Sequence, residues 1–132
     1  MNPGDVIFWR QFEFPDGQRS DKLFIIANRP RDGVHLGFIV TSQQKRGRTQ
    51  EDGCRHVDRW YFVRPRSTCF QSPTWVLFDD AYEFLLDELT GLRADGSIRL
   101  ISGKVQSLVL NAIVSCFQLT DSVTDYHRAL LR

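Results

Sequence analysis

The stretch LFIIANRPRDGVHLGFIVT, residues 23–41, decides how this chain folds. It opens with an apolar run rich in isoleucine, passes through a polar segment that contains Pro30 and Gly33, and continues with a second apolar run from Val34 to Thr41. Isoleucine, valine and phenylalanine favour strands, whereas proline and glycine mark turns. We therefore predict two strands that pair as a hairpin.

Other segments on both sides of this hairpin also have strand character. The first of them ends at the turn Pro15-Asp16-Gly17, so a loop is expected over residues 15–21. A polar loop from Ser42 to Gly53 separates the hairpin from the next strand. These further strands are predicted at residues 5–14, 54–63, 75–78 and 98–101. The sequence thus predicts about five strands.

In the C-terminal third, the spacing of apolar residues changes from the two-residue period of a strand to the 3.6-residue period of a helix. Apolar side chains recur there at the spacing of one helix face, which predicts an amphipathic helix over residues 104–117 that Ser102 would cap. The members of this face are Val105, Leu108, Val109, Ala112, Ile113, Cys116 and Phe117. Strands followed by a helix indicate an α+β, mainly β fold, a small twisted β-barrel with helices on one side.

A shorter, acidic helix is predicted between the last two strands. Tyr82, Leu85, Leu86 and Leu89 have helical spacing, and Gly91 is placed to end the helix. Either Asp79 or Asp80 would cap its start, where a carboxylate meets the positive end of the helix dipole.

Length and composition indicate a single domain over residues 1–132. The chain is 42% hydrophobic and 25% charged, which suits a packed core and excludes intrinsic disorder. The longest apolar stretches have only four residues, too few for a membrane span of about 20. The N-terminus lacks the pattern of a secretory signal, so a cytoplasmic location is expected. The three cysteines are then expected to be reduced thiols.

The net charge is only +1, but basic side chains are concentrated between Lys45 and Arg66. This segment holds seven basic residues against three acidic ones, and its Trp60 and Tyr61 could stack on unpaired bases. The same pattern also fits a solvated loop beside a core tryptophan. Both interpretations stay open from the sequence.

Other chemistry has little support in the sequence. Cys54 and His56 could form a nucleophilic pair, but no third group can be named to orient them. Neither His56 nor His35 has partners at metal-ligand spacing, so no metal site is expected. The glycine-rich motifs of nucleotide-binding proteins do not occur, so no cofactor is expected.

Four segments, in order, resemble the PemK/MazF family of toxins from toxin–antitoxin systems. They are Pro3-Gly4-Asp5-Val6-Ile7, Phe14-Pro15-Asp16-Gly17, Lys22-Leu23-Phe24-Ile25-Ile26 and Ile39-Val40-Thr41-Ser42-Gln43. Trp75 to Asp79 and residues 98–116 match more loosely. The resemblance implies an SH3-like barrel, a homodimer, metal-independent cleavage of single-stranded RNA, and an antitoxin protein that occupies the RNA groove.

The resemblance also implies roles for individual residues. Thr41 matches the threonine that contacts the scissile phosphate, and Asp79 matches an aspartate proposed as the base in some members. Lys22 stands where the family has its catalytic arginine, and a lysine lacks the planar fork that grips two phosphate oxygens. The expected catalytic residues are thus Lys22, Thr41 and Asp79, with His35 or Arg46 in reserve. The expected RNA-binding residues are Ser42, Gln43, Lys45, Arg46 and Arg48.

Two alternatives follow from the same residues. Lys22 stands where the family has arginine, which favours a barrel that no longer cleaves RNA. Such a barrel would only bind RNA or a protein partner, such as an antitoxin-like peptide. A narrower version is a poison of DNA gyrase, as in other relatives of this barrel.

Overall fold

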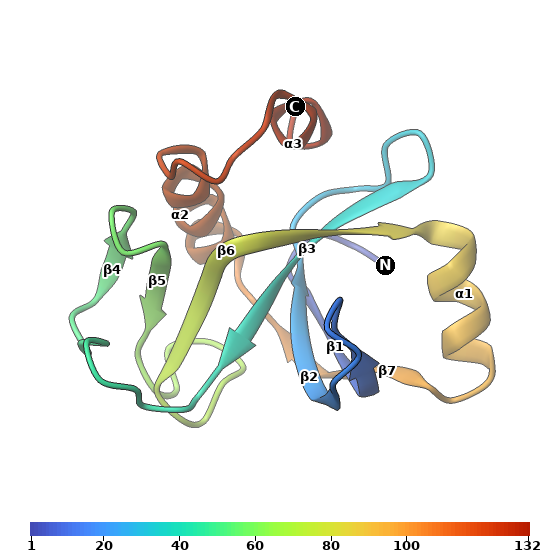
Figure 1. Ribbon diagram of the computed structural model, residues 1–132, viewed down its shortest axis with the longest axis horizontal. Helices are drawn as coiled ribbons and strands as arrows, with labels where there is room; N and C mark the ends of the chain where they lie inside the picture. Colours follow the sequence, from blue (N-terminus) through green and yellow to red (C-terminus); the bar gives the residue numbers. More distant parts are fainter.

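The computed structural model describes all 132 residues and consists of one antiparallel sheet and three short helices (Figure 1). The strands are β1 (Asp5–Glu13), β2 (Arg19–Ile26), β3 (Val34–Thr41), β4 (Gly53–Arg55), β5 (Trp60–Val63), β6 (Thr74–Leu85) and β7 (Ile98–Lys104). The helices are α1 (Leu86–Ala94), α2 (Ser107–Gln118) and α3 (Asp125–Leu130). The expected α+β, mainly β class is confirmed.

The sheet has seven strands in the order β4-β5-β6-β3-β2-β1-β7, more than the five expected. The edge strands β4 and β7 do not pair with each other, so hydrogen bonding does not close the sheet into a barrel. One extra strand arises because the segment 54–63 is not one strand but the hairpin β4–β5, in which Cys54 pairs with Tyr61.

The predicted hairpin of residues 23–41 is confirmed. Strands β2 and β3 pair antiparallel from Leu23↔Val40 to Ile26↔Gly37. The buried Asn28 organises the turn between them, since its Oδ1 accepts a hydrogen bond from the Leu36 amide (2.7 Å) and its Nδ2 donates to the Leu130 carbonyl (3.0 Å). The turn is thereby bonded to both β3 and α3.

Helices α2 and α3 cover one side of the sheet, which we call the helical face (Figure 1). The predicted C-terminal helix is confirmed, and it buries Leu110, Ile113, Cys116 and Phe117 against the sheet. The predicted cap was wrong. Ser102 lies in β7, and the helix begins after Gln106, whose side chain makes no capping bond.

The opposite side of the sheet carries a cluster of aromatic rings, and we call it the aromatic face. Its rings are those of Trp9, Phe12, Phe14, Phe24, Tyr82 and Phe84. Helix α1 covers only part of it, where Leu89 packs with Ile7 and Ile98.

The short acidic helix begins later than predicted, at Leu86, and Gly91 lies inside it. Tyr82 and Leu85 belong to β6, because residues 81–85 pair with β3 down to Leu85↔Val34. Strand pairing therefore overrides the helical spacing of the apolar residues. For the same reason Asp79 and Asp80 lie in a strand and cap no helix.

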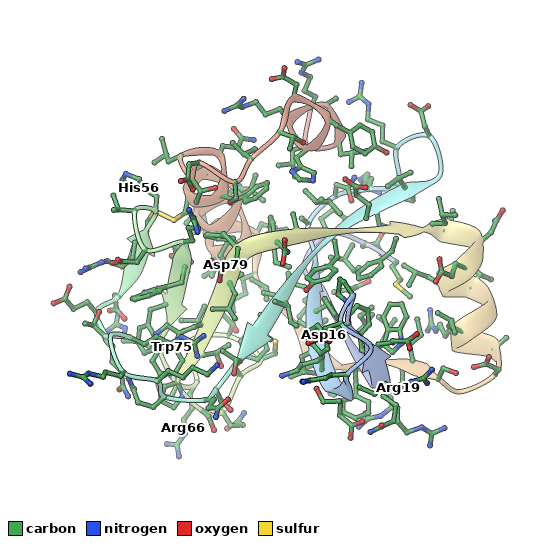
Figure 2. The ribbon with its side chains drawn as sticks, in the orientation of Figure 1. Asp16, Arg19, His56, Arg66, Trp75 and Asp79 are labelled. Atoms are coloured by element: carbon green, nitrogen blue, oxygen red, sulfur yellow. A yellow bond between two sulfur atoms is a disulfide. The ribbon has the colours of Figure 1, made fainter.

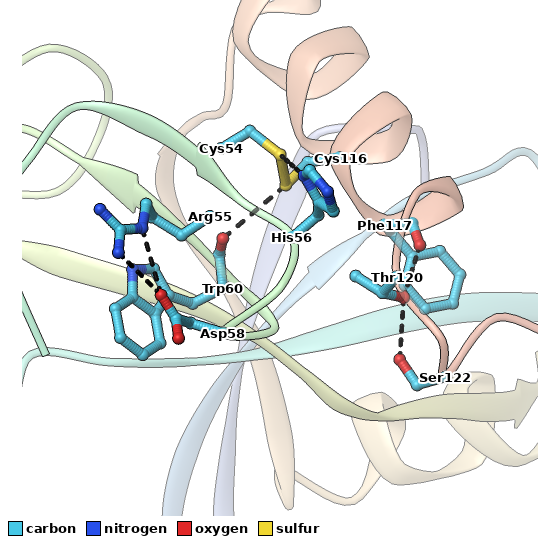
Figure 3. Close-up of a disulfide and its surroundings, with 9 residues drawn as sticks. All are labelled: Cys54, Arg55, His56, Asp58, Trp60, Cys116, Phe117, Thr120 and Ser122. Carbon is cyan, nitrogen blue, oxygen red and sulfur yellow. Dashed lines mark hydrogen bonds and ion pairs between the residues drawn. A yellow bond between two sulfur atoms is a disulfide. The ribbon is translucent and has the colours of Figure 1, made fainter. Parts of the chain in front are cut away.

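A disulfide joins Cys54 on β4 to Cys116 on α2 (Figure 3). The expectation of three reduced thiols is therefore wrong for two of them, and only Cys69 is free. Sequence spacing could not indicate this bond, because the two cysteines are 62 residues apart. The bond ties the edge of the sheet to the helix that covers it.

Candidate functional site

Lys22 and Thr41 come together at the ends of two paired strands. The β2–β3 register contains Phe24↔Ile39 and Leu23↔Val40, so the next position along the register places Lys22 opposite Thr41. Side chains alternate between the two sides of a strand, so both residues share the side of Phe24, the aromatic face. Lys22 Nζ lies 5.9 Å from the centre of the Phe14 ring on this face.

A pocket of about 310 Å³ lies at these strand ends. Four predicted site residues line it: Lys22, Thr41, Ser42 and Gln43. The remaining lining is Phe8, Asp21, Leu23, Val40, Phe70 and Thr74. The hydroxyl oxygen of Thr41 accepts a hydrogen bond from the Gln43 amide (3.1 Å), which leaves its own hydrogen free to donate.

Asp21 is the carboxylate of this pocket, and sequence reasoning missed it. Its Oδ1 accepts hydrogen bonds from the backbone amide (3.0 Å) and the side chain (3.2 Å) of Gln11. Gln11 has φ 54° and sits where the β1–β2 register shifts between Trp9 and Phe12. Nothing in the sequence signals this contact, because it depends on the irregularity in β1.

Asp79 is not part of the pocket. It lies on β6 beside the β4–β5 hairpin, well apart from Asp16 and Arg19 at the β1–β2 turn (Figure 2). Its Oδ1 is 3.6 Å from Arg59. Arg59 in turn donates two hydrogen bonds to Asp121 (2.7 and 3.0 Å), which lower the pKa of that carboxyl group. The structure therefore separates Asp79 from Lys22 and Thr41.

The loop between β3 and β4 carries the other predicted RNA-binding residues, Lys45, Arg46 and Arg48. It is fixed at two points: Arg48 donates to the Gln43 carbonyl (2.9 Å), and the indole of Trp75 donates to the Thr49 carbonyl (3.0 Å). Lys45 and Arg46 are exposed and form no ion pair. The loop thus adjoins the pocket through Gln43.

Ion pairing divides the basic segment into two groups. Arg55, Arg59 and Arg64 form ion pairs with carboxylates of the chain. The four without such partners are Lys45, Arg46, Arg48 and Arg66. The positive charge available to a polyanion therefore lies mainly on the loop next to the pocket.

Two aromatic residues proposed to stack on bases are occupied in the fold. Trp60 is buried with Phe62 and Trp75, and Arg55 and Asp58 lie beside its ring (Figure 3). Tyr61 is half-buried and packs against the core of the helical face. Neither ring forms an open platform beside the pocket.

The histidines do not contribute to the pocket. His35 is fully buried, and its Nδ1 donates to the Asn28 carbonyl (3.2 Å). Nδ1 of His56 is 3.9 Å from Cys54 Sγ, but that sulfur belongs to the disulfide and cannot act as a nucleophile while the bond is intact. No group of three or more His, Cys, Asp or Glu side chains is arranged to hold a metal ion.

Comparisons of this chain with known protein families, curated proteins and solved structures find no match. The resemblance to PemK/MazF toxins therefore remains an expectation from the sequence. None of the three helices has the length and apolar character that a bilayer crossing requires.

Proposed function

We propose that this protein is a toxin-like endoribonuclease that cleaves single-stranded RNA without a metal ion. The observation that carries the proposal is the shared pocket of Lys22, Thr41, Ser42 and Gln43, which come from two different strands and the loop after the second. The Lys22 ammonium can pair with the negative charge of a phosphodiester. The hydroxyls of Thr41 and Ser42 and the side-chain amide of Gln43 can donate hydrogen bonds to its oxygens. The unpaired charges of Lys45, Arg46 and Arg48 would bind the neighbouring phosphates.

The proposed reaction is an attack of the ribose on its own phosphate. Asp21 accepts the proton of the 2′-hydroxyl, the 2′-oxygen forms a bond to phosphorus, and the bond to the 5′-oxygen breaks. Lys22 gives a proton to the leaving 5′-oxygen, and the Thr41 hydroxyl donates a hydrogen bond to a phosphate oxygen. The products are a 2′,3′-cyclic phosphate and a 5′-hydroxyl. Asp21 takes this role instead of Asp79 because Asp21 lines the pocket and Arg59 holds Asp79 elsewhere. Asp21 and Lys22 are neighbours in β2 and leave opposite sides of the strand, so the proposed position of the phosphate is over the strand end, between the two side chains.

The finer features implied by the resemblance belong to the same proposal: an SH3-like barrel, a homodimer, an antitoxin protein and a cytoplasmic location.

One observation favours a second function, RNA binding without cleavage. Lys22 provides a point charge at a position where bidentate contact with two phosphate oxygens would stabilise the transition state better. The pocket and the basic loop would still hold a strand under this alternative.

Cleavage of a long unstructured RNA in the presence of EDTA tests the proposal. The wild-type protein should produce fragments with cyclic phosphate ends, and Thr41→Ala should lose this activity. Gln50→Ala is a matched control on the neighbouring exposed loop and should cleave normally. Salt-sensitive binding of RNA without any fragments would instead support the binding function.

A further inference from the structure

The aromatic face holds a continuous row of rings that starts at Lys22. Phe14 lies under the Lys22 ammonium, the centres of Phe14 and Phe12 are 5.1 Å apart, and those of Phe12 and Tyr82 are 5.6 Å apart. Phe12 is buried, whereas Phe14 and Tyr82 on either side of it are only half-buried. The row therefore presents ring surface to solvent next to the proposed phosphate site.

A cleft of about 660 Å³ continues from this row. Its aromatic walls are Trp9, Phe12, Tyr82 and Phe84. Its charged residues are Arg10, Arg19, Glu13, Glu83 and Glu88. Arg19 is paired with Glu13 (3.5 Å), whereas Arg10 forms no ion pair, and the carboxylates can accept hydrogen bonds from the amino group of a base. The volume falls within the usual range of small-ligand pockets, about 300–1,000 Å³. Figure 2 shows Arg19 beside β1, near the β1–β2 turn that carries Asp16.

Tyr82 has a polar group without a partner in the protein. Its hydroxyl makes no hydrogen bond to any residue of the chain, while the ring packs against Phe12 and Phe24. Burial raises the pKa of this hydroxyl, and Asp80 and Asp79 raise it further. The phenol is therefore neutral near pH 7, and its hydroxyl is free to bond to the sugar or phosphate of a nucleotide whose base lies on the ring.

We infer that this cleft binds an unpaired nucleobase of the RNA strand whose phosphate lies at Lys22. The base stacks on the exposed surface of Tyr82 within the row Phe14–Phe12–Tyr82, and Arg10, which has no carboxylate partner in the chain, contacts the adjoining phosphate. Aromatic side chains bind single strands in this way because every base has a π face. The inference rests on the proposed function for its substrate, but it does not require that the strand is cut.

A hexamer of 2′-O-methyluridine is the probe, because it lacks the attacking hydroxyl and is not cleaved. A set of six further hexamers, each with one abasic residue at a different position, keeps all phosphates and removes one base at a time. Binding is followed by the fluorescence of Trp9, which lies in the cleft, whereas Trp60 and Trp75 are buried. Trp9→Phe identifies the part of the signal that belongs to Trp9.

We expect the full hexamer to quench Trp9 and the best-placed abasic hexamer to bind about 5- to 150-fold more weakly, the range for loss of one stacked base. Tyr82→Leu should show a loss of the same size, whereas Tyr82→Phe keeps the ring and should bind within about threefold of the wild type. Phe14→Leu provides a second variant if Tyr82→Leu does not fold.

The outcomes separate this inference from the proposed function. Base-dependent binding with quenching supports the inference even if no RNA is cleaved. Cleavage of RNA together with equal binding of the full hexamer and every abasic hexamer would overturn the inference and leave the nuclease intact. Failure to bind any RNA would overturn both.

Discussion

Lys22 on β2 and Thr41 on β3 lie one step beyond Leu23↔Val40, the last pair of the β2–β3 ladder, and both line the same pocket. Eighteen residues, including the seven-residue connection between β2 and β3, separate them in the chain, so only the antiparallel register brings the cation and the hydroxyl to one strand end. If Lys22 and Thr41 act on a phosphate, the rate of RNA cleavage should depend on how the cation at position 22 contacts the phosphate oxygens.

Replacement of Lys22 should therefore change cleavage in two directions. Lys22→Ala should lower the rate of RNA cleavage by about 100- to 1,000-fold, as expected for one lost transition-state donor. Lys22→Arg should cleave at least as fast as the wild type, because guanidinium can contact two phosphate oxygens. Initial rates on one RNA substrate test this. A slower Lys22→Arg enzyme would show that proton donation by the lysine is required.

The two aspartates can be compared directly. Asp21→Asn should abolish most of the cleavage activity, because it removes the carboxylate that lines the pocket. Asp79→Asn should leave the rate within about threefold of the wild type, since Arg59 directs Asp79 away from the pocket. Both changes keep the shape of the side chain. The opposite pattern would assign the base to Asp79 and contradict the mechanism.

Reduction of the Cys54–Cys116 bond should destabilise the fold. A cross-link over 62 residues restricts the unfolded chain, and its loss is expected to lower the free energy of unfolding by about 2–4 kcal/mol. Urea unfolding with and without dithiothreitol measures this difference. Cys54→Ser should behave like the reduced wild type, whereas Cys69→Ser should keep the full response to reductant.

His35 should make the stability depend on pH. Burial lowers its pKa below the ordinary value of 6.5, so the unfolded chain binds a proton more readily than the folded one. The free energy of unfolding should therefore fall as the pH decreases below about 6.5 and stay level with respect to this group above it. Urea unfolding between pH 5 and 7.5 tests the slope. His35→Gln should lose that part of the slope, and an unchanged slope would exclude His35 as its source.

Gly37 should tolerate no side chain. A Cβ at this position would lie 2.6 Å from Cε2 of the buried Phe84, so Gly37→Ala should destabilise the protein by about 1–3 kcal/mol. Gly91→Ala is the matched control, because nothing lies near its Cβ and alanine favours a helix interior. Thermal unfolding should show a lower midpoint for the first variant and an equal or higher one for the second.

The sequence by itself determined the local structure of this protein. The apolar runs and the turn within residues 23–41 dictated the β2–β3 hairpin, and the helical period near the C-terminus dictated α2. Both patterns depend on neighbours along the chain, so they can be read without knowledge of the fold. The β2–β3 register that brings Thr41 near Lys22 is set by the backbone pairing of the two strands and not by these patterns.

Only the tertiary structure decided the features that depend on distant partners. Residues 81–85 look helical in isolation, but they extend β6 because β3 offers unsatisfied backbone groups. Cys54 and Cys116 meet because α2 packs against β4. Arg59 forms ion pairs with both Asp79 and Asp121. The backbone amide of Gln11 donates a hydrogen bond to Asp21, which positions this carboxylate at the pocket. The row from Phe14 to Tyr82 likewise joins the end of β1 to the far half of β6. Spacing along the chain carries no information about such contacts, because packing between elements sets their distances.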